Sequence, residues 1–278
     1  IAEVCKKVNI EENFIRYALD NEEKARIDIE DEDNTVLFII DVPVRERERD
    51  SIIYSTMPIG IIFVRDDYFI TVSLNKNQII ENLENKLKNI ITYKKSRLLL
   101  QIFYSNAEMY LNLLKKINKE IAEYILKNSM KNKELLKLLS LEKSLVYFTT
   151  SLKSNEVVME KTMRGKIVKL YEEDEDLLED SIIENKQAIE MSKIYSDILT
   201  GTMDAYASII SNNLNGVMKF LTSITIILAI PTMLASYWGM NVKVPLENNP
   251  YAFYIILLVS VIIAIIVTLW LNKKNMLK

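Results

Sequence analysis

The stretch Phe220–Asn272, FLTSITIILAIPTMLASYWGMNVKVPLENNPYAFYIILLVSVIIAIIVTLWLN, decides the fold class of this chain. It contains two uncharged runs, Phe220–Val242 of 23 residues and Asn248–Asn272 of 25 residues. A helix needs roughly 20 residues to cross the hydrocarbon core of a bilayer. We therefore expect two C-terminal transmembrane helices, at residues 220–242 and 250–272, joined by a loop at residues 239–249.

The lysines around these two runs predict the orientation of the chain in the membrane. Lys219 precedes the first run, Lys273 and Lys274 follow the second within a basic tail at residues 273–278, and Lys243 is the only lysine of the loop. Cytoplasmic flanks of transmembrane helices carry an excess of Lys and Arg. The N-terminus has no continuous apolar core of the kind that a signal peptide needs. Both termini are therefore expected in the cytosol and the loop outside.

The composition excludes several classes of function. The chain has 278 residues, a net charge of −3, no histidine and one cysteine, Cys5. Zinc hydrolases need histidine or several cysteines, and serine and cysteine hydrolases commonly need a histidine base. One cysteine cannot form an internal disulfide, and no basic patch suits a nucleic acid. We expect no enzyme activity, no cofactor and no nucleic-acid partner.

The first part of the chain has the pattern of a small sheet covered by helices. Short β-rich apolar runs lie at Thr35–Val44, Ser51–Met57, Ile59–Arg65 and Tyr68–Ser73. Helix-forming residues at helical spacing then continue to about Lys161. These patterns predict a cytosolic α/β/α domain at residues 1–165. Because the chain begins with Ile1 inside a helical pattern, we expect further residues to precede it in the native protein.

One very long helix follows this domain. From about Lys166 to Trp238 the only proline is Pro231, and the apolar periodicity runs directly into the first uncharged run. A helix of about 70 residues is on the order of 100 Å long. The segment at residues 166–219 is therefore predicted to be a stalk, supported by copies of itself or by the preceding helices.

A row of polar and small side chains runs along the second half of this helix. Alternating steps of four and three, which is the coiled-coil repeat, connect its members. We call this row the polar seam, and it consists of Asp204, Ser208, Ser211, Asn215, Met218, Thr222, Thr225, Ala229, Thr232 and Ser236.

Two interpretations of the polar seam stay open from the residues alone. Small and hydroxyl-bearing side chains let membrane helices approach closely. Alternatively, they line a wet pore, where hydroxyl and amide dipoles suit an ion. Two transmembrane helices cannot enclose a pore, so the second interpretation requires a symmetric oligomer. Asp204 would then form an anionic ring, Asn215 an amide ring, and Met218 with neighbouring Leu221 an apolar constriction that gates by dewetting.

The loop carries the residues of a known family. The sequence Tyr237-Trp238-Gly239-Met240-Asn241 at the end of the first of two C-terminal spans resembles the signature of the CorA magnesium channels and transporters. The run Ser211–Lys219 and the pair Pro231-Thr232 are also similar to the family pattern. The resemblance is strongest from about Asp180 to the end of the chain.

The resemblance implies a fold and a function. It implies a funnel-shaped homopentamer in the cytoplasmic membrane, with the first span lining the pore, the second outside it, and Gly239, Met240 and Asn241 forming the selectivity filter. Mg²⁺ dehydrates reluctantly, so a ring of Asn241 amide oxygens can hydrogen-bond the water shell of the ion. Glu247 would concentrate cations at the mouth. Mg²⁺ is then both the transported and the regulatory ion.

The resemblance also implies a sensor for cytosolic Mg²⁺ made of carboxylates at subunit interfaces. Asp180 matches the stalk position of that sensor. The usual acidic pair on the other side falls near Arg16-Tyr17, so the nearest acids, Asp20, Glu22 and Glu23, would have to substitute. Acidic runs at the start of a helix also favour the helix dipole without binding any metal.

We expect a Mg²⁺ channel, with Co²⁺ and Ni²⁺ as further ions. Two alternatives are a Zn²⁺ transporter of the same superfamily and a membrane-anchored coiled-coil scaffold that conducts nothing. The intact Met240 and the lack of histidine favour magnesium. The scaffold predicts an apolar seam, whereas this seam is rich in hydroxyl groups.

Overall fold

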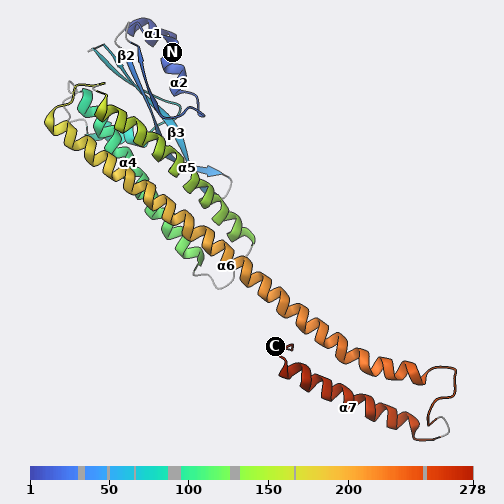
Figure 1. Cartoon of the computed structure of the whole chain (residues 1–278). Coiled ribbons are helices and arrows are strands. Elements are labelled where there is room, and N and C mark those ends of the chain that lie inside the picture. The colour runs from blue at the N-terminus through green and yellow to red at the C-terminus, as the bar shows by residue number, and fades with distance from the viewer. Residues whose placement is uncertain are drawn as a thin grey trace. The chain divides into compact units, whose positions relative to one another are not determined.

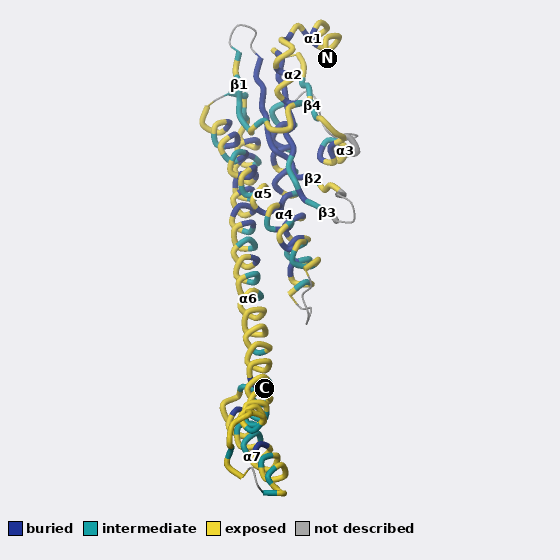
Figure 2. Tube along the Cα trace, turned by 90° about the vertical axis from the view of Figure 1, so that its right-hand side faces the viewer, coloured by how far each residue is buried: buried dark blue, intermediate teal, exposed yellow. Residues whose placement is uncertain are grey.

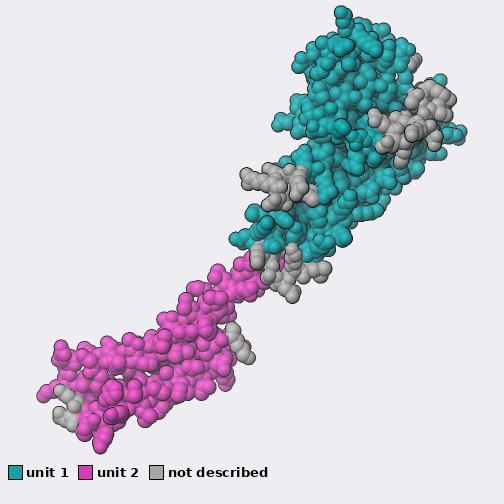
Figure 3. Space-filling model, turned by 180° about the vertical axis from the view of Figure 1, so that it is seen from behind, with its two compact units in different colours: residues 1–202 teal, residues 203–278 magenta. Residues whose placement is uncertain are grey.

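A computed structural model of the chain divides into two compact units, residues 1–202 (unit 1) and residues 203–278 (unit 2) (Figure 3). The structure describes residues 1–30, 35–48, 51–65, 67–86, 95–125, 132–165, 167–246 and 249–277. The helices are α1 Ala2–Val8, α2 Glu12–Ala18, α3 Gln78–Lys86, α4 Lys95–Ile125, α5 Asn132–Arg164, α6 Glu172–Trp238 and α7 Ala252–Lys273 (Figure 1).

Unit 1 contains one antiparallel sheet in the order β1-β2-β3-β4. Its strands are β1 Arg26–Glu30, β2 Thr35–Glu48, β3 Ser51–Val64 and β4 Tyr68–Ser73. The expected α/β/α domain is confirmed, with two corrections to its strands. The sequence pattern did not reveal β1, and the two runs that we expected at residues 51–57 and 59–65 form the single strand β3.

Both faces of the sheet are covered, which explains the continuous apolar run of β2. Phe38 and Ile40 face a core that contains Phe103 of α4 and Val158 of α5. Residues of the opposite parity, such as Leu37 and Ile39, face α1 and α2. Cys5 is buried in that second core as a free thiol. Most of β2 and the second half of β3 are accordingly dark blue in Figure 2, whereas the edge strands β1 and β4 are partly exposed.

The merging of two predicted strands into β3 has a local explanation. Pro58 lies opposite Asp41 of β2, just outside the part of β3 that pairs with β4. A proline is tolerated in a strand where no neighbouring strand needs its N–H. Gly60, two residues after Pro58, lies against α2. A Cβ at Gly60 would come within 2.4 Å of the Cβ of Ala18. Glycine therefore allows α2 to pack closely on β3.

Side chains from two helices complete β2 beyond the end of β1. The last pair between β1 and β2 is Arg26 with Ile39, so Asp41 has no partner strand on that side. The amide of Asn155 makes both missing bonds: its Oδ1 accepts from the Asp41 N–H at 2.8 Å, and its Nδ2 donates to the Asp41 carbonyl at 2.7 Å. Asn106 and Tyr110 of α4 donate to the same carbonyl.

The carboxyl group of Asp41 is buried in this cluster of polar groups. Burial raises the pKa of Asp41 to about 6, above the usual range of an aspartate, and the neighbouring Ser151 hydroxyl partly opposes the shift. Asp41 also raises the pKa of Tyr110, which burial has already raised. At neutral pH, the folded chain therefore holds a buried carboxylate at a cost in stability.

We expect Asp41→Asn to stabilise unit 1 at pH 7.5 and to change little at pH 4. The folded state holds the Asp41 proton up to about pH 6, whereas the unfolded chain releases it near pH 4. The free energy of unfolding of the parent therefore falls by about 3 kcal/mol as the pH rises from 4 to 7.5. The variant has no carboxyl group at position 41, so its free energy of unfolding does not fall for this reason. Denaturant unfolding of parent and variant at both pH values measures the difference. An equal difference at both pH values would contradict the expectation.

The boundaries of the long helices differ from the sequence expectation by a few residues. The stalk helix begins at Glu172 and not at residue 166, because Asp174 Oδ2 accepts a hydrogen bond from the Tyr171 N–H at 3.4 Å and caps the start. The first predicted span ends at Trp238 and not at residue 242. The second begins at Ala252, where Asn249 Oδ1 accepts from the Tyr251 N–H.

Candidate functional site: the uncovered face of α6

Helix α6 is one continuous helix of 67 residues, and in unit 1 it packs on α5 along one side. Asn185 Nδ2 donates to the Leu152 carbonyl at 2.9 Å, and Ser192 Oγ donates to the Leu145 carbonyl at 3.0 Å. The two donors are seven residues apart, and so are the two acceptors, which fixes an antiparallel register. The buried residues of α6 on this side are Asp174, Leu178, Ser181, Ile182, Asn185, Ala188, Ile189, Ser192 and Leu199.

In unit 2, the same heptad position of α6 is covered again, this time by α7 and the tail. Ser223 is fully buried, and its Oγ lies 3.1 Å from the Met276 carbonyl, which can accept its hydrogen bond. Ile227, Ile230 and Leu234 are half-buried on this side. Steps of three and four lead along one row of α6 positions from Leu199 to Ser223, although members between them, such as Ile209 and Phe220, are exposed. We call this row the covered seam.

The polar seam lies on the other side of α6 and is uncovered. Every member of it, from Asp204 to Ser236, is exposed in the single chain, and so is Leu221 beside it. Met218 is 54% exposed and Leu221 is 58% exposed, although both are large and apolar. The structure thus brings the predicted pore residues to one free face. These residues are Asp204, Ser208, Ser211, Asn215, Met218, Leu221, Thr222, Thr225, Thr232 and Ser236.

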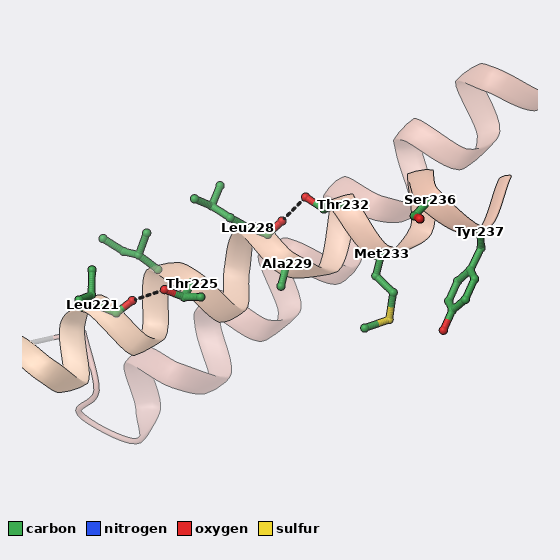
Figure 4. Close-up of a pocket in the computed structure, with 9 residues that line it drawn as sticks. Leu221, Thr225, Leu228, Ala229, Thr232, Met233, Ser236 and Tyr237 are labelled. Atoms are coloured by element: carbon green, nitrogen blue, oxygen red, sulfur yellow. Dashed lines mark hydrogen bonds between the residues drawn. The ribbon is translucent and has the colours of Figure 1, made fainter. Parts of the chain in front are cut away.

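Two threonines of this face, Thr225 and Thr232, present acceptors and not donors. Thr225 Oγ1 donates to the Leu221 carbonyl, and Thr232 Oγ1 donates to the Leu228 carbonyl, each at 2.9 Å (Figure 4). A hydroxyl has one proton and two lone pairs, so a hydroxyl that donates to its own helix keeps lone pairs for outside donors. An open groove runs along this part of α6, lined by Leu221, Thr225, Leu228, Ala229, Thr232 and Ser236 among others.

The predicted filter follows directly after α6. The Gly239 N–H donates to the Ala235 carbonyl at 2.9 Å, as a last helical bond. Met240 is 53% exposed, and Asn241 is exposed as well. Glu247, which we expected at the mouth, lies outside the described residues. The side chains of Met240 and Asn241 are thus free to meet groups from outside the subunit.

Glycine at position 239 has no explanation within the subunit. Its φ is not positive, so the backbone conformation does not itself demand glycine. A Cβ at Gly239 would meet the Ala235 carbonyl oxygen at 3.4 Å, which is a tolerable contact. Within the described residues, neither backbone strain nor a close contact therefore requires glycine at this position.

A contact that the sequence analysis missed closes the loop around the filter. Trp238 Nε1 donates to the Pro245 carbonyl at 3.2 Å. The two residues are seven apart and enclose Gly239, Met240 and Asn241. Only the presence of an indole before the Gly-Met-Asn triplet could have signalled it, since no sequence pattern gives the position of Pro245.

The two carboxylates that we expected in a regulatory site lie apart from any metal cluster. Asp180 and Asp20 are both exposed, and the Asp20 carboxylate accepts from the Glu22 N–H at 3.0 Å. Among the residues that the structure describes, no group of three or more acidic or cysteine side chains could hold a metal ion. The described residues of the single chain therefore do not complete a metal site around Asp180.

The acidic run before Asp180 has a structural role at its start. Asp174 is 2% exposed, and Arg97 of α4 lies 3.4 Å from its carboxylate and 3.0 Å from that of Glu173. Asp174 also caps α6. The ion pairs of Asp174 and Glu173 with Arg97 hold the beginning of α6 against α4. Asp180 does not share these contacts.

The lysines at the membrane ends are also separated as expected within unit 2. The hydrogen bond between Ser223 and Met276 brings the start of the first span beside the end of α7. Lys219, Lys273 and Lys274 therefore belong to one end of the α6–α7 hairpin. Lys243 belongs to the loop at the other end. Within the described residues, α6 and α7 are both long and apolar enough to span a membrane.

Comparisons with known proteins agree with this geometry. Residues 1–274 match the family model of the CorA-like Mg²⁺ transporter protein. The cobalt/magnesium transport protein CorA of Methanocaldococcus jannaschii is 30% identical over 275 residues, which are 95% of this chain and 83% of that protein. The protein of the same name from Thermotoga maritima is 31% identical over 148 residues, covering 49% of this chain and 42% of its own.

A solved structure extends the similarity to the fold. The complete structure of the CorA magnesium transporter from Methanocaldococcus jannaschii superposes with a TM-score of 0.84 and 30% identity. It covers 96% of this chain, and this chain covers 84% of it. The similarity thus includes the soluble domain, the long helix and both candidate membrane helices.

Proposed function

The chain belongs to the CorA family of Mg²⁺ transporters, and from that premise we propose that it forms a homopentameric channel for hydrated Mg²⁺ in the cytoplasmic membrane. Co²⁺ is proposed as a second ion because the relatives are named cobalt/magnesium transport proteins, and Ni²⁺ as a third. The membrane potential drives entry, and cytosolic Mg²⁺ closes the channel.

The polar seam on the uncovered face of α6 is the observation that carries this proposal. In unit 2, α7 covers the opposite side of α6 and leaves the hydroxyl groups without a partner outside their own helix. Polar groups that face lipid are unfavourable, so this face requires either water or another subunit. A ring of α6 helices around a wet axis satisfies it, and each position then supplies a ring of identical groups.

The acceptor character of this face suits a hydrated cation. The water molecules around Mg²⁺ point their protons outward, and the lone pairs of Thr225 and Thr232 can accept them. Mg²⁺ keeps most of its water because dehydration is costly. Asn241 amide oxygens at the mouth would select the ion by the same outer-sphere hydrogen bonds, and a close approach of Gly239 backbones from neighbouring subunits would explain the glycine.

Gating is assigned to Met218 and Leu221, and regulation to Asp180 with Asp20. A ring of methionine and leucine side chains excludes water from a narrow pore and thereby stops ions. Both termini face the cytosol in this arrangement, because the lysine-bearing end of the α6–α7 hairpin lies inside. The scaffold alternative predicts an apolar seam, which α6 lacks, and no described feature favours zinc.

We expect Asp180→Lys to weaken the closing effect of cytosolic Mg²⁺ by about tenfold in concentration. The lysine replaces a proposed Mg²⁺ ligand with a cation, so more Mg²⁺ is needed to hold neighbouring subunits together. Current recorded against internal Mg²⁺ measures the shift. Glu175→Lys is the matched control, since it changes the charge of the same acidic run at an exposed residue. Equal Mg²⁺ dependence of Asp180→Lys and the parent would remove Asp180 from the sensor.

The function as a whole is tested by flux into liposomes that contain the purified full-length protein. A Mg²⁺ dye is enclosed, and the internal potential is made negative. Rapid Mg²⁺ entry that a hexaammine complex blocks would support the channel, since this complex imitates hydrated Mg²⁺. Proton-coupled Zn²⁺ movement without Mg²⁺ entry would favour the zinc alternative. Absence of any flux from an assembled oligomer would favour the scaffold.

A further inference from the structure

The hydrogen bond between Trp238 and Pro245 gives the filter loop a closed geometry. Trp238 is the last residue of α6, and its indole N–H reaches across the loop to the Pro245 carbonyl, with an Nε1–O distance of 3.2 Å. The ring of chain that this bond closes has Gly239, Met240 and Asn241 as its first three members. The indole itself is half-buried, whereas the three filter residues are exposed.

The remaining described hydrogen bonds of the loop lie at its two ends. On the α6 side, the Gly239 N–H donates to the Ala235 carbonyl. On the α7 side, the Asn249 N–H donates to the Leu246 carbonyl, and Asn249 Oδ1 accepts from the Tyr251 N–H. Within the described part of the loop, the Trp238–Pro245 bond is thus the side-chain contact that spans the filter residues.

The chemistry of Trp238 and Pro245 suits a hydrogen bond that closes the loop. Proline fixes its own φ, so the Pro245 carbonyl is held by a stiff residue. An indole N–H donates only, and at a membrane boundary it usually bonds water or a lipid headgroup. In this chain it bonds the loop instead. A loop that is closed before the ion arrives loses less conformational entropy when the ion binds.

We propose that Trp238 is a positioning residue for the filter. Its indole N–H fixes the position along the pore axis at which Asn241 presents its amide oxygen. The inference deepens the proposed channel function and rests on it. Trp238 does not touch the ion. Because the subunits are identical, the Trp238–Pro245 hydrogen bond repeats in every subunit of the ring. Loss of one donor per chain therefore increases the conformational freedom of every Asn241 at the same time.

Removal of the indole N–H alone tests the proposal in the full-length oligomer. Trp238→Phe keeps an aromatic ring and loses the donor, and benzothienylalanine at position 238 keeps the full shape of the indole and loses only the N–H. We expect both variants to need about tenfold more hexaammine complex for half-maximal block of Mg²⁺ entry, the factor that corresponds to the loss of one hydrogen bond. We also expect an about tenfold lower preference for Mg²⁺ over Na⁺.

The control separates positioning from a general effect on the fold. Tyr251→Phe removes a polar hydrogen from an exposed aromatic residue at the other end of the same loop, and we expect parent values for block and selectivity. The oligomer size and melting temperature of all variants should equal those of the parent. If Trp238→Phe lowers the melting temperature, the benzothienylalanine variant decides the matter.

The outcomes distinguish this inference from the proposed function. A parent protein that carries no Mg²⁺ contradicts the channel itself. A conducting parent whose benzothienylalanine variant keeps the parent block and selectivity overturns the role of Trp238 and leaves the channel intact. Weaker block and lower selectivity in an intact oligomer support the role of Trp238.

Discussion

Asn241→Ala should nearly abolish Mg²⁺ entry into liposomes, with a fall of about 100-fold. The amide oxygen is the acceptor that we assign to the first water shell of the ion, and alanine offers none. A hydrogen bond to a charged group contributes up to about 3 kcal/mol, and each 1.4 kcal/mol corresponds to a factor of about ten. The fall should therefore be visible in the initial rate of dye response at every potential.

The matched control for Asn241→Ala is Val242→Ala. Val242 is the next residue of the same loop and is 59% exposed in the single chain. Its truncation removes apolar surface but no acceptor, so the initial rate should stay near that of the parent. Both variants should elute at the oligomer volume of the parent. Retained Mg²⁺ entry in an assembled Asn241→Ala oligomer would remove Asn241 from the filter.

Met218→Asp should raise the leak current at high internal Mg²⁺, where the parent is closed, by about tenfold or more. An apolar constriction stops ions because water does not remain in it, and a ring of carboxylates holds water there. The carboxylates also attract cations to the former barrier. Planar-bilayer recording at fixed internal Mg²⁺ measures the leak.

Met218→Leu serves as the comparison for the gate. It keeps an apolar side chain of similar size on the polar seam, and we expect the closed-state leak of the parent. The exposure of Met218 in the single chain is consistent with a ring of side chains that meet only in the oligomer. If Met218→Asp assembles and its leak equals that of Met218→Leu, the constriction lies elsewhere on α6.

The sequence predicted the elements that depend on contiguous residues. Two uncharged runs identified both membrane helices, and the repeat of four and three identified the polar seam, because each pattern lies within one helix. The family followed from Gly239-Met240-Asn241 in its place between the spans. The boundaries of the helices were not predicted to the residue, since Asp174 caps α6 through a contact that propensity does not reveal.

The parts of the site that sequence reasoning missed depend on residues far apart in the chain or on single contacts. The backbone carbonyl of Asp41, at the open edge of β2, accepts a hydrogen bond from Asn155, which is 114 residues away. The bond between Trp238 and Pro245 depends on the path of a loop. Within the described residues of the single chain, no contact requires glycine at position 239, and no metal-binding cluster includes Asp180.

The sequence alone therefore determined which helices cross the membrane and which side chains of α6 share a row, because helical geometry relates near neighbours by a fixed rotation. The tertiary structure decided which row stays free. Asn185 and Ser192 donate hydrogen bonds to α5, and Ser223 contacts the tail. These side chains of the covered seam therefore already have partners within the same chain. Helical periodicity cannot decide between two rows of the same helix, because that choice depends on the packing of distant segments.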